Sequence, residues 1–146
     1  MKNALSRITG ILALAFLAAH PAYAQEPMLV NVPFAFTAGK MTLTAGEYRV
    51  QNNKGDSAVL LIERTDSSAA TFVASNAVEV STPQPQSKLI FHRYGNRYFL
   101  AQVWIEGHLR GRQLLPSAKE KEQALLAHNE APDQVTIVAS LLRAKP

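Results

Sequence analysis

The sequence predicts a mainly β protein: a single antiparallel β-sandwich or small β-barrel of about 7–8 strands, with one short α-helix in its C-terminal half. A cleaved N-terminal signal helix precedes this domain. Three observations carry the prediction. Apolar side chains alternate along LVNVPFAFT, the dipeptide Gly95-Asn96 separates two β-rich runs, and Ser117 and Glu120 have the spacing of a helix capping box.

The N-terminal segment has the three parts of a secretory signal peptide. Two basic residues, Lys2 and Arg7, precede an apolar run over residues 8–19, and Ala22 and Ala24 supply the small side chains at positions −3 and −1. A membrane-spanning helix is the alternative, but the run is shorter than the roughly 20 residues that cross a bilayer.

Cleavage after this segment leaves Gln25 as the first mature residue. The predicted organisation is therefore a signal peptide over 1–24 and a single secreted β-domain over 25–146, without a transmembrane segment. The expected location is extracytoplasmic, either periplasmic or secreted.

Composition limits the function of the mature chain. Its 122 residues form one domain of ordinary size, and 13 basic against 11 acidic residues give a net charge of +2. Such a balance lacks the dense basic face of a nucleic-acid-binding protein, so no nucleic acid partner is expected. The chain is cysteine-free, which excludes disulfides, thiolate nucleophiles and thiolate metal sites.

The first mature strand is predicted in LVNVPFAFT. Its alternating side chains Val30, Val32, Phe34 and Phe36 share one buried face. Pro33 points outward and cannot donate a ladder hydrogen bond, which favours an edge strand.

Three further strands are expected before the central hairpin, with ends marked by residues that favour turns. The run 58–63 is apolar on both faces, which is typical of a strand covered on both sides. Two prolines then extend the loop 81–86. The three strands are expected over 47–51, 58–63 and 71–80.

Residues 88–106 predict a β-hairpin that turns at Gly95-Asn96. In this register Tyr94 faces Arg97 and Arg93 faces Tyr98, so arginine–aromatic pairs flank the tip.

The helix is expected from Ala118 to about His128, with Ser117 as its N-cap. Its thin apolar side, Ala118 with Leu125 and Leu126, is expected to lie across one end or face of the sheet. The last strand is expected over 134–142.

The segments VPFAFTAGKMTLTAGEYRV, KLIFHRYGNRYFLAQVW and GRQLLPSAKEKE occur in this order. In them the chain resembles small uncharacterised secreted bacterial proteins of the acidobacterial type, which share VPFxF, TLxAGEYRV and FHRYGxRYFL motifs. The resemblance implies an envelope or extracellular location and supplies no catalytic residues.

Residues capable of catalysis or metal binding are not grouped in the sequence. The mature histidines His92, His108 and His128 lack the i, i+2 or i, i+4 spacing that chelates a metal, and no serine lies in a G-x-S-x-G elbow. Glu47, Glu63 and Glu106 are expected on the solvent side of strands. The sequence therefore predicts no catalytic residue, metal or cofactor, and an enzyme is not the expected function.

The most basic local feature is the loop 107–112. With the hairpin tip it provides candidate residues for binding an anionic ligand or a partner, which are Arg93, Tyr94, Arg97, Tyr98, His108, Arg110 and Arg112. The alternative is a solvated connection between two strands.

Two functional classes remain open. The first is a non-catalytic β-domain that binds a protein, a polysaccharide or an envelope component through its surface. The second is a small barrel that carries an apolar or anionic small ligand inside it. An interior packed with Phe, Val and Leu favours the first class, whereas one emptied by small residues such as Ala58, Ala74 and Ala101 favours the second.

Overall fold

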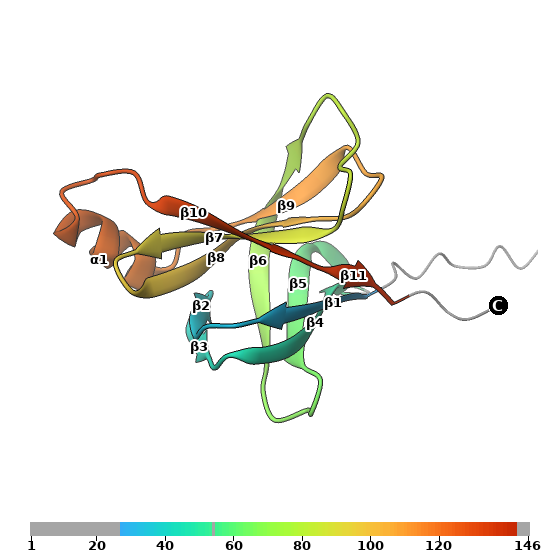
Figure 1. The fold of residues 1–146 in the computed structure, drawn as a ribbon, viewed down its shortest axis with the longest axis horizontal. Helices are drawn as coiled ribbons and strands as arrows, with labels where there is room; N and C mark the ends of the chain where they lie inside the picture. The colour runs from blue at the N-terminus through green and yellow to red at the C-terminus, as the bar shows by residue number, and fades with distance from the viewer. Residues whose placement is uncertain (1–26, 54, 143–146) are drawn as a thin grey trace, which may run out of the picture.

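The computed structural model describes residues 27–53 and 55–142, so the predicted signal peptide and its cleavage residues Ala22, Ala24 and Gln25 lie outside the described part. The described residues form eleven strands and one helix (Figure 1). The strands of the first half are β1 (Met28–Val32), β2 (Phe36–Ala38), β3 (Met41–Leu43), β4 (Gly46–Asn53), β5 (Asp56–Arg64) and β6 (Ala70–Glu79). The second half contains β7 (Lys88–Tyr94), β8 (Arg97–Trp104), β9 (Arg110–Leu114), α1 (Ala118–Leu126), β10 (Asp133–Val138) and β11 (Ser140–Leu141).

The predicted fold class is confirmed: the protein is mainly β and has a single helix among its described residues. The strand count exceeds the predicted number because β2, β3 and β11 have only two or three residues each. Segments this short are not visible as periodic patterns in a sequence.

Pro33 divides the first predicted strand. β1 ends at Val32 and β2 begins at Phe36, so the four alternating side chains are distributed over two strands. Val30, Val32 and Phe36 are buried as predicted, and Phe34 is partly buried against the core. The predicted edge position is wrong, because β1 pairs with β4 on one side and with β11 on the other.

The sheet is rolled, and two chain segments are shared between its layers. The hydrogen-bonded order is β10-β7-β8-β9-β6-β5-β4-β1-β11. The first half of β6 pairs with β5 and its second half with β9. Strands that pass from one layer to the other form the corners of barrel-like sandwiches.

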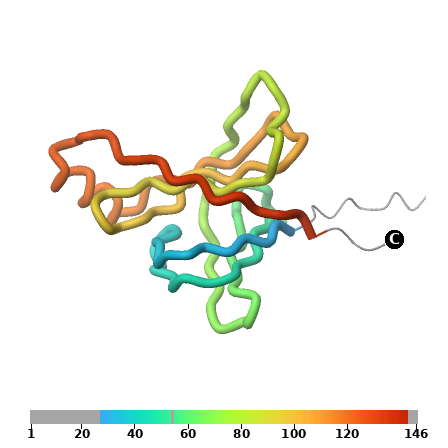
Figure 2. The backbone as a smooth tube through the Cα atoms, in the orientation of Figure 1, coloured from blue at the N-terminus to red at the C-terminus, as the bar shows by residue number. Residues whose placement is uncertain are grey.

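The second shared segment is the C-terminal one. β10 and β11 stand at opposite ends of the strand order, yet only Ala139 separates them in the chain. β10 pairs with β7, and β11 pairs with β1. Figure 2 shows this red segment running from the yellow hairpin to the blue strand β1. One bent segment therefore spans both edges of the sheet.

The rolled sheet encloses a core with large side chains. Phe36 lies edge-on to Tyr48 and to Phe91, with ring centroids 5.2 and 5.3 Å apart. All three rings are at most 2% exposed. Burial of one such apolar side chain stabilises the fold by roughly 1.5–3 kcal/mol.

The β7–β8 hairpin has the predicted register. Tyr94 faces Arg97 and Arg93 faces Tyr98, and Gly95 adopts the positive φ of 61° that the tight turn requires. A bulge between Ile90 and Phe91 shifts the pairing further from the tip.

Helix α1 begins as predicted but buries a different side. The Ser117 hydroxyl accepts a hydrogen bond from the Glu120 amide at 3.1 Å, which confirms the N-cap. The predicted packing is wrong, since Leu125 and Leu126 are 68% and 69% exposed. Glu120 is buried instead, and its carboxylate lies 2.9 Å from Nδ1 of His92. No helix among the described residues is long and apolar enough to cross a membrane.

Candidate functional site

The predicted binding residues form two groups at opposite ends of β8. The tip group contains Arg93, Tyr94, Arg97 and Tyr98 and surrounds the first residue of β8. The second group, here called the mouth group because it lies at an open end of the rolled sheet, contains His108, Arg110 and Arg112. These residues follow the last residue of β8. Eight residues of extended chain span ~25 Å. The structure therefore does not bring the two groups into one site.

Side chains of the tip group contact other parts of the protein. Arg93 donates a hydrogen bond to Asp133 at 2.8 Å, and this interaction raises the pKa of the guanidinium. Tyr98 stacks on Phe34 with ring centroids 3.8 Å apart. Burial, followed by the negative charge of Glu120, raises the pKa of Tyr94. These contacts attach α1, β10 and the chain after Pro33 to the hairpin.

A cavity of about 310 Å³ lies beside the tip, between β2–β3, β8 and α1. Arg97 and Tyr98 line it together with Lys119 and Glu122. Its lining also includes the carboxylate of Glu122, which offsets part of the positive charge of Arg97 and Lys119 inside the cavity itself.

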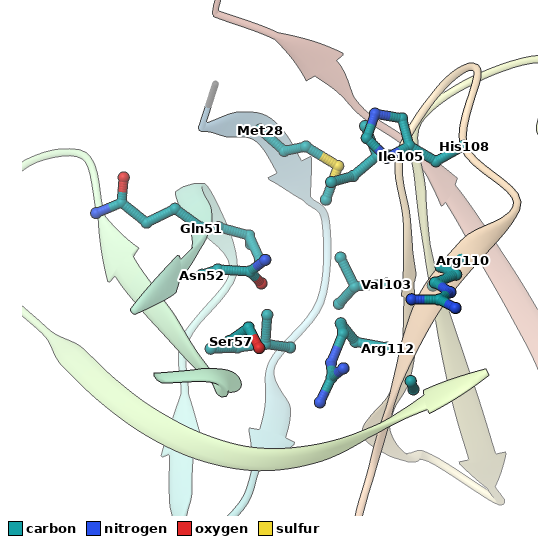
Figure 3. Close-up of a pocket in the computed structure, with 13 residues that line it drawn as sticks. Met28, Gln51, Asn52, Ser57, Val103, Ile105, His108, Arg110 and Arg112 are labelled. Carbon is teal, nitrogen blue, oxygen red and sulfur yellow. The ribbon is translucent and has the colours of Figure 1, made fainter. Parts of the chain in front are cut away.

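The mouth group lines a pocket of about 270 Å³ at the other end of the rolled sheet (Figure 3). Its floor is apolar and consists of core side chains, Met28, Val50, Leu60 and Val103. Gln51, Asn52 and Ser57 of the β4–β5 hairpin form one wall, and Ala77, Ile105, His108, Arg110, Gly111 and Arg112 complete the lining. No carboxylate among the described residues lines this pocket.

Strand pairing explains the position of Arg112. Directly opposed residues of neighbouring strands share a face, and Arg112 stands opposite Ala77 of β6 and Val103 of β8. Val103 belongs to the core, so Arg112 is on the inner face of the sheet. The small side chain of Ala77 leaves room for the guanidinium at this end.

Ser75 holds the guanidinium of Arg112. Nε donates to the Ser75 hydroxyl at 2.9 Å, and Nη2 donates to the Ser75 carbonyl at 2.7 Å. The hydroxyl in turn donates to the carbonyl of Ala58 at 2.8 Å, and Ser75 is 4% exposed. Both partners of Arg112 are neutral, so these contacts orient its charge without cancelling it.

Arg110 and His108 are less constrained. Nε of Arg110 lies 2.6 Å from a Glu79 carboxylate oxygen, and both side chains are well exposed. Such a surface pair adds little stability. The His108 backbone accepts from the Gln84 amide at 3.2 Å, and Gly107 donates to the Gln84 carbonyl at 2.9 Å. These bonds attach the basic loop to the segment before β7.

Sequence reasoning missed several residues of this site. Met28 and Ser57 line the pocket, and Ser75 holds Arg112. One signal was present. The residues Val73, Ser75, Ala77 and Glu79 occupy one face of β6, and along this face the apolar character gives way to small and polar side chains. A polar end on an inward face indicates a site where the core opens.

Within residues 27–53 and 55–142, no group of three or more His, Cys, Asp or Glu side chains is placed so that it could hold a metal ion. Comparisons of the whole chain with protein-family models, with curated proteins and with solved structures find no match.

Proposed function

We propose that this chain is a non-catalytic extracytoplasmic binding domain, and that its mouth pocket receives an anionic group of a protein, polysaccharide or envelope partner. One observation carries the proposal. The pocket combines two arginines and a histidine with an apolar floor, and no described carboxylate lines it. A concave apolar site with a few convergent polar groups is the usual form of a ligand pocket.

The chemistry of the lining favours holding a ligand over transforming it. Arg110 and Arg112 remain protonated at physiological pH, so they bind an anion without exchanging a proton with it. Glu79 already pairs with Arg110, whereas the polar partners of Arg112 among the described residues are neutral groups of Ser75. Arg112 is therefore the proposed anchor for the ligand's charge.

The packed core supports binding at the mouth over transport inside a barrel. Tyr48, Phe36 and Phe91 fill the centre and are almost fully buried. Of the three alanines that would line an empty interior, Ala74 is exposed and Ala58 only partly buried. Only Ala101 is buried, so the carrier function has less support.

The proposed location rests on the sequence of residues 1–24. Its test is the intact mass of the protein recovered from the extracytoplasmic fraction after expression of the full chain. An intact mass equal to that of residues 25–146 supports export with cleavage after Ala24. A full-length mass confined to the cytoplasm contradicts it.

The binding proposal is tested by NMR titration of residues 25–146 with acetate and with inorganic phosphate. We expect saturable shifts of the Ser57, Gly111 and Arg112 amides, and smaller ones at the hairpin tip. Arg112→Gln should weaken binding at least tenfold, because it removes the charge that no carboxylate balances.

The matched control is Arg97→Gln, which removes the same charge at the opposite end of β8 and should leave the shifts of the Ser57, Gly111 and Arg112 amides unchanged. Equal losses in both variants would show general electrostatic attraction and would overturn the proposed site. The absence of any saturable shift would overturn it as well.

A further inference from the structure

The chemical class of the ligand can be argued from the position of Arg112, provided that the proposed function holds. A guanidinium on an inward-facing strand position is costly to desolvate unless polar groups receive it. Here Ser75 receives it, and Val103 of the core stands directly opposite on β8. The charge therefore lies at the boundary between the core and the open pocket.

Arg112 lines the pocket, and Ser75 occupies one edge of its guanidinium. The hydrogen bonds to Ser75 use Nε and one Nη2 proton. Of the five N–H donors of an arginine, the two on Nη1 and the second on Nη2 are left for a ligand. The two parallel donors of the Nη1–Nη2 edge match the two oxygens of a carboxylate, and fixing the adjacent Nε–Nη2 edge lowers the entropy lost on binding.

Charge matching favours a singly charged group. Glu79 neutralises Arg110, whereas Arg112 is held by the neutral Ser75. The pocket thus presents about one uncompensated positive charge, which a carboxylate balances and a phosphate dianion exceeds.

The remainder of the pocket is apolar and small. In Figure 3, Met28 and Ile105 occupy one end and Arg112 the opposite end, with Val103 between them. A volume of about 270 Å³ is at the small end of ligand pockets, so the site suits a short apolar group beside a carboxylate.

We propose that the mouth pocket binds a carboxylate joined to a short apolar group, with the carboxylate on the Nη1–Nη2 edge of Arg112 and the apolar group over Met28, Val103 and Ile105. Two sources have this chemistry. One is a free short-chain carboxylic acid, and the other is the C-terminal apolar residue of a peptide.

The test measures dissociation constants by NMR for residues 25–146 with acetate, hexanoate and 1-hexanol. Each methylene that the floor covers should tighten binding by roughly fourfold. Hexanoate should therefore bind at least tenfold more tightly than acetate, and at least tenfold more tightly than 1-hexanol. The largest shifts are expected at Val103, Ile105 and Arg112.

Two variants separate the parts of the site. Ile105→Thr should weaken hexanoate binding while leaving acetate binding unchanged, because it removes apolar contact only. Arg112→Lys keeps the charge but lacks the planar fork, so it should weaken hexanoate at least fivefold. Arg97→Gln serves as the control, and thermal melting of each variant reports whether it is folded.

Two further probes distinguish the sources. N-acetyl-leucine binding more tightly than hexanoate assigns a peptide C-terminus, and the reverse order assigns a free acid. N-acetyl-leucinamide, which lacks the carboxylate, should fail to bind in either case.

Hexanoate binding no more tightly than acetate, or equal binding of hexanoate and 1-hexanol, would overturn the proposed class. Equal binding of the amide and the acid would do the same. In these cases acetate and phosphate would still shift the mouth amides, so the proposed anionic site would stand. Loss of the acetate and phosphate shifts as well would mean that the proposed function itself fails.

Discussion

The two ends of β8 use similar basic side chains in different ways. At the tip, Arg93 pairs with Asp133, and the neighbouring His92 pairs with Glu120. At the mouth, Arg112 is held by the hydroxyl and carbonyl of Ser75. A basic group that meets an acid joins two elements, whereas the charge of Arg112 is not balanced by its neutral partner. This contrast separates structural contacts from the proposed binding group within one sheet.

Both ends of β8 are held by the same core. The largest effect is therefore expected from a substitution in the core, which should disrupt both ends. Val32 is fully buried in the core and pairs with Gly46 of β4, so Val32→Asp places an unpaired carboxylate there. We expect soluble folding to be abolished, as judged by circular dichroism and by loss of a cooperative melt. A variant that melts like the wild type would show that the core assignment is wrong.

The next largest loss of stability is expected from a substitution near the hairpin tip. His92→Leu removes the partner of Glu120, whose side chain is 8% exposed, and leaves a buried carboxylate unpaired. A loss of ~2 kcal/mol in the free energy of unfolding is expected, measured by urea denaturation. Acetate binding at the mouth should not change.

The control for this variant is His92→Leu combined with Glu120→Leu. Replacing both polar partners by apolar groups costs less than orphaning one of them, so the double variant should be the more stable. If it is less stable than His92→Leu alone, the pair does not explain how α1 is attached.

A smaller effect is expected at the N-cap of α1. Ser117→Ala removes the acceptor for the Glu120 amide and should cost ~1 kcal/mol. The urea midpoint provides the measurement, with Ser81→Ala in an exposed loop as the matched control. Equal midpoints for the two variants would contradict the capping role.

The smallest effect is expected at an exposed arginine–carboxylate pair, Arg64 and Asp66, in the turn after β5. It tests how much such a structural pair contributes to stability. Hydrogen bonds from Ser68, followed by one from Arg64, lower the pKa of Asp66 from its ordinary 3.8 to about 2. A carboxyl with a lowered pKa in the folded state stabilises the fold above its ordinary pKa, and the contribution disappears as the pH falls towards 2.

The corresponding variant is Asp66→Asn. It should lower the urea midpoint at pH 7 and change it much less near pH 2, where about half of the wild-type carboxyl is itself protonated. An equal loss at both values would mean that the charge of Asp66 does not contribute.

Much of the fold could be predicted because its signals are local. Alternation located β1 and the core residues Val30 and Val32, and Gly95 fixed the register of the β7–β8 hairpin. The rolled shape could not be predicted in this way. It depends on β6 and the β10–β11 segment each serving two layers, and residue patterns do not record which strands are neighbours.

Only the part of the candidate site that is local in sequence could be predicted. Arg110 and Arg112 are conspicuous because they are close together in a basic loop. Ser75 acts on Arg112 across 37 positions of sequence, and Met28 reaches the same pocket from the start of the described chain. The buried side of α1 was missed because Glu120 is retained by His92, 28 positions away.

The bent segment that ends in β11 sets the order in which this protein is completed. A chain emerges from its N-terminus, so the free edges of β1 and β7 must wait for residues 133–141, which pair with both. Exposed strand edges invite pairing with other chains. A nascent or prematurely terminated chain therefore exposes two edges at once, and one short segment covers both in a single step.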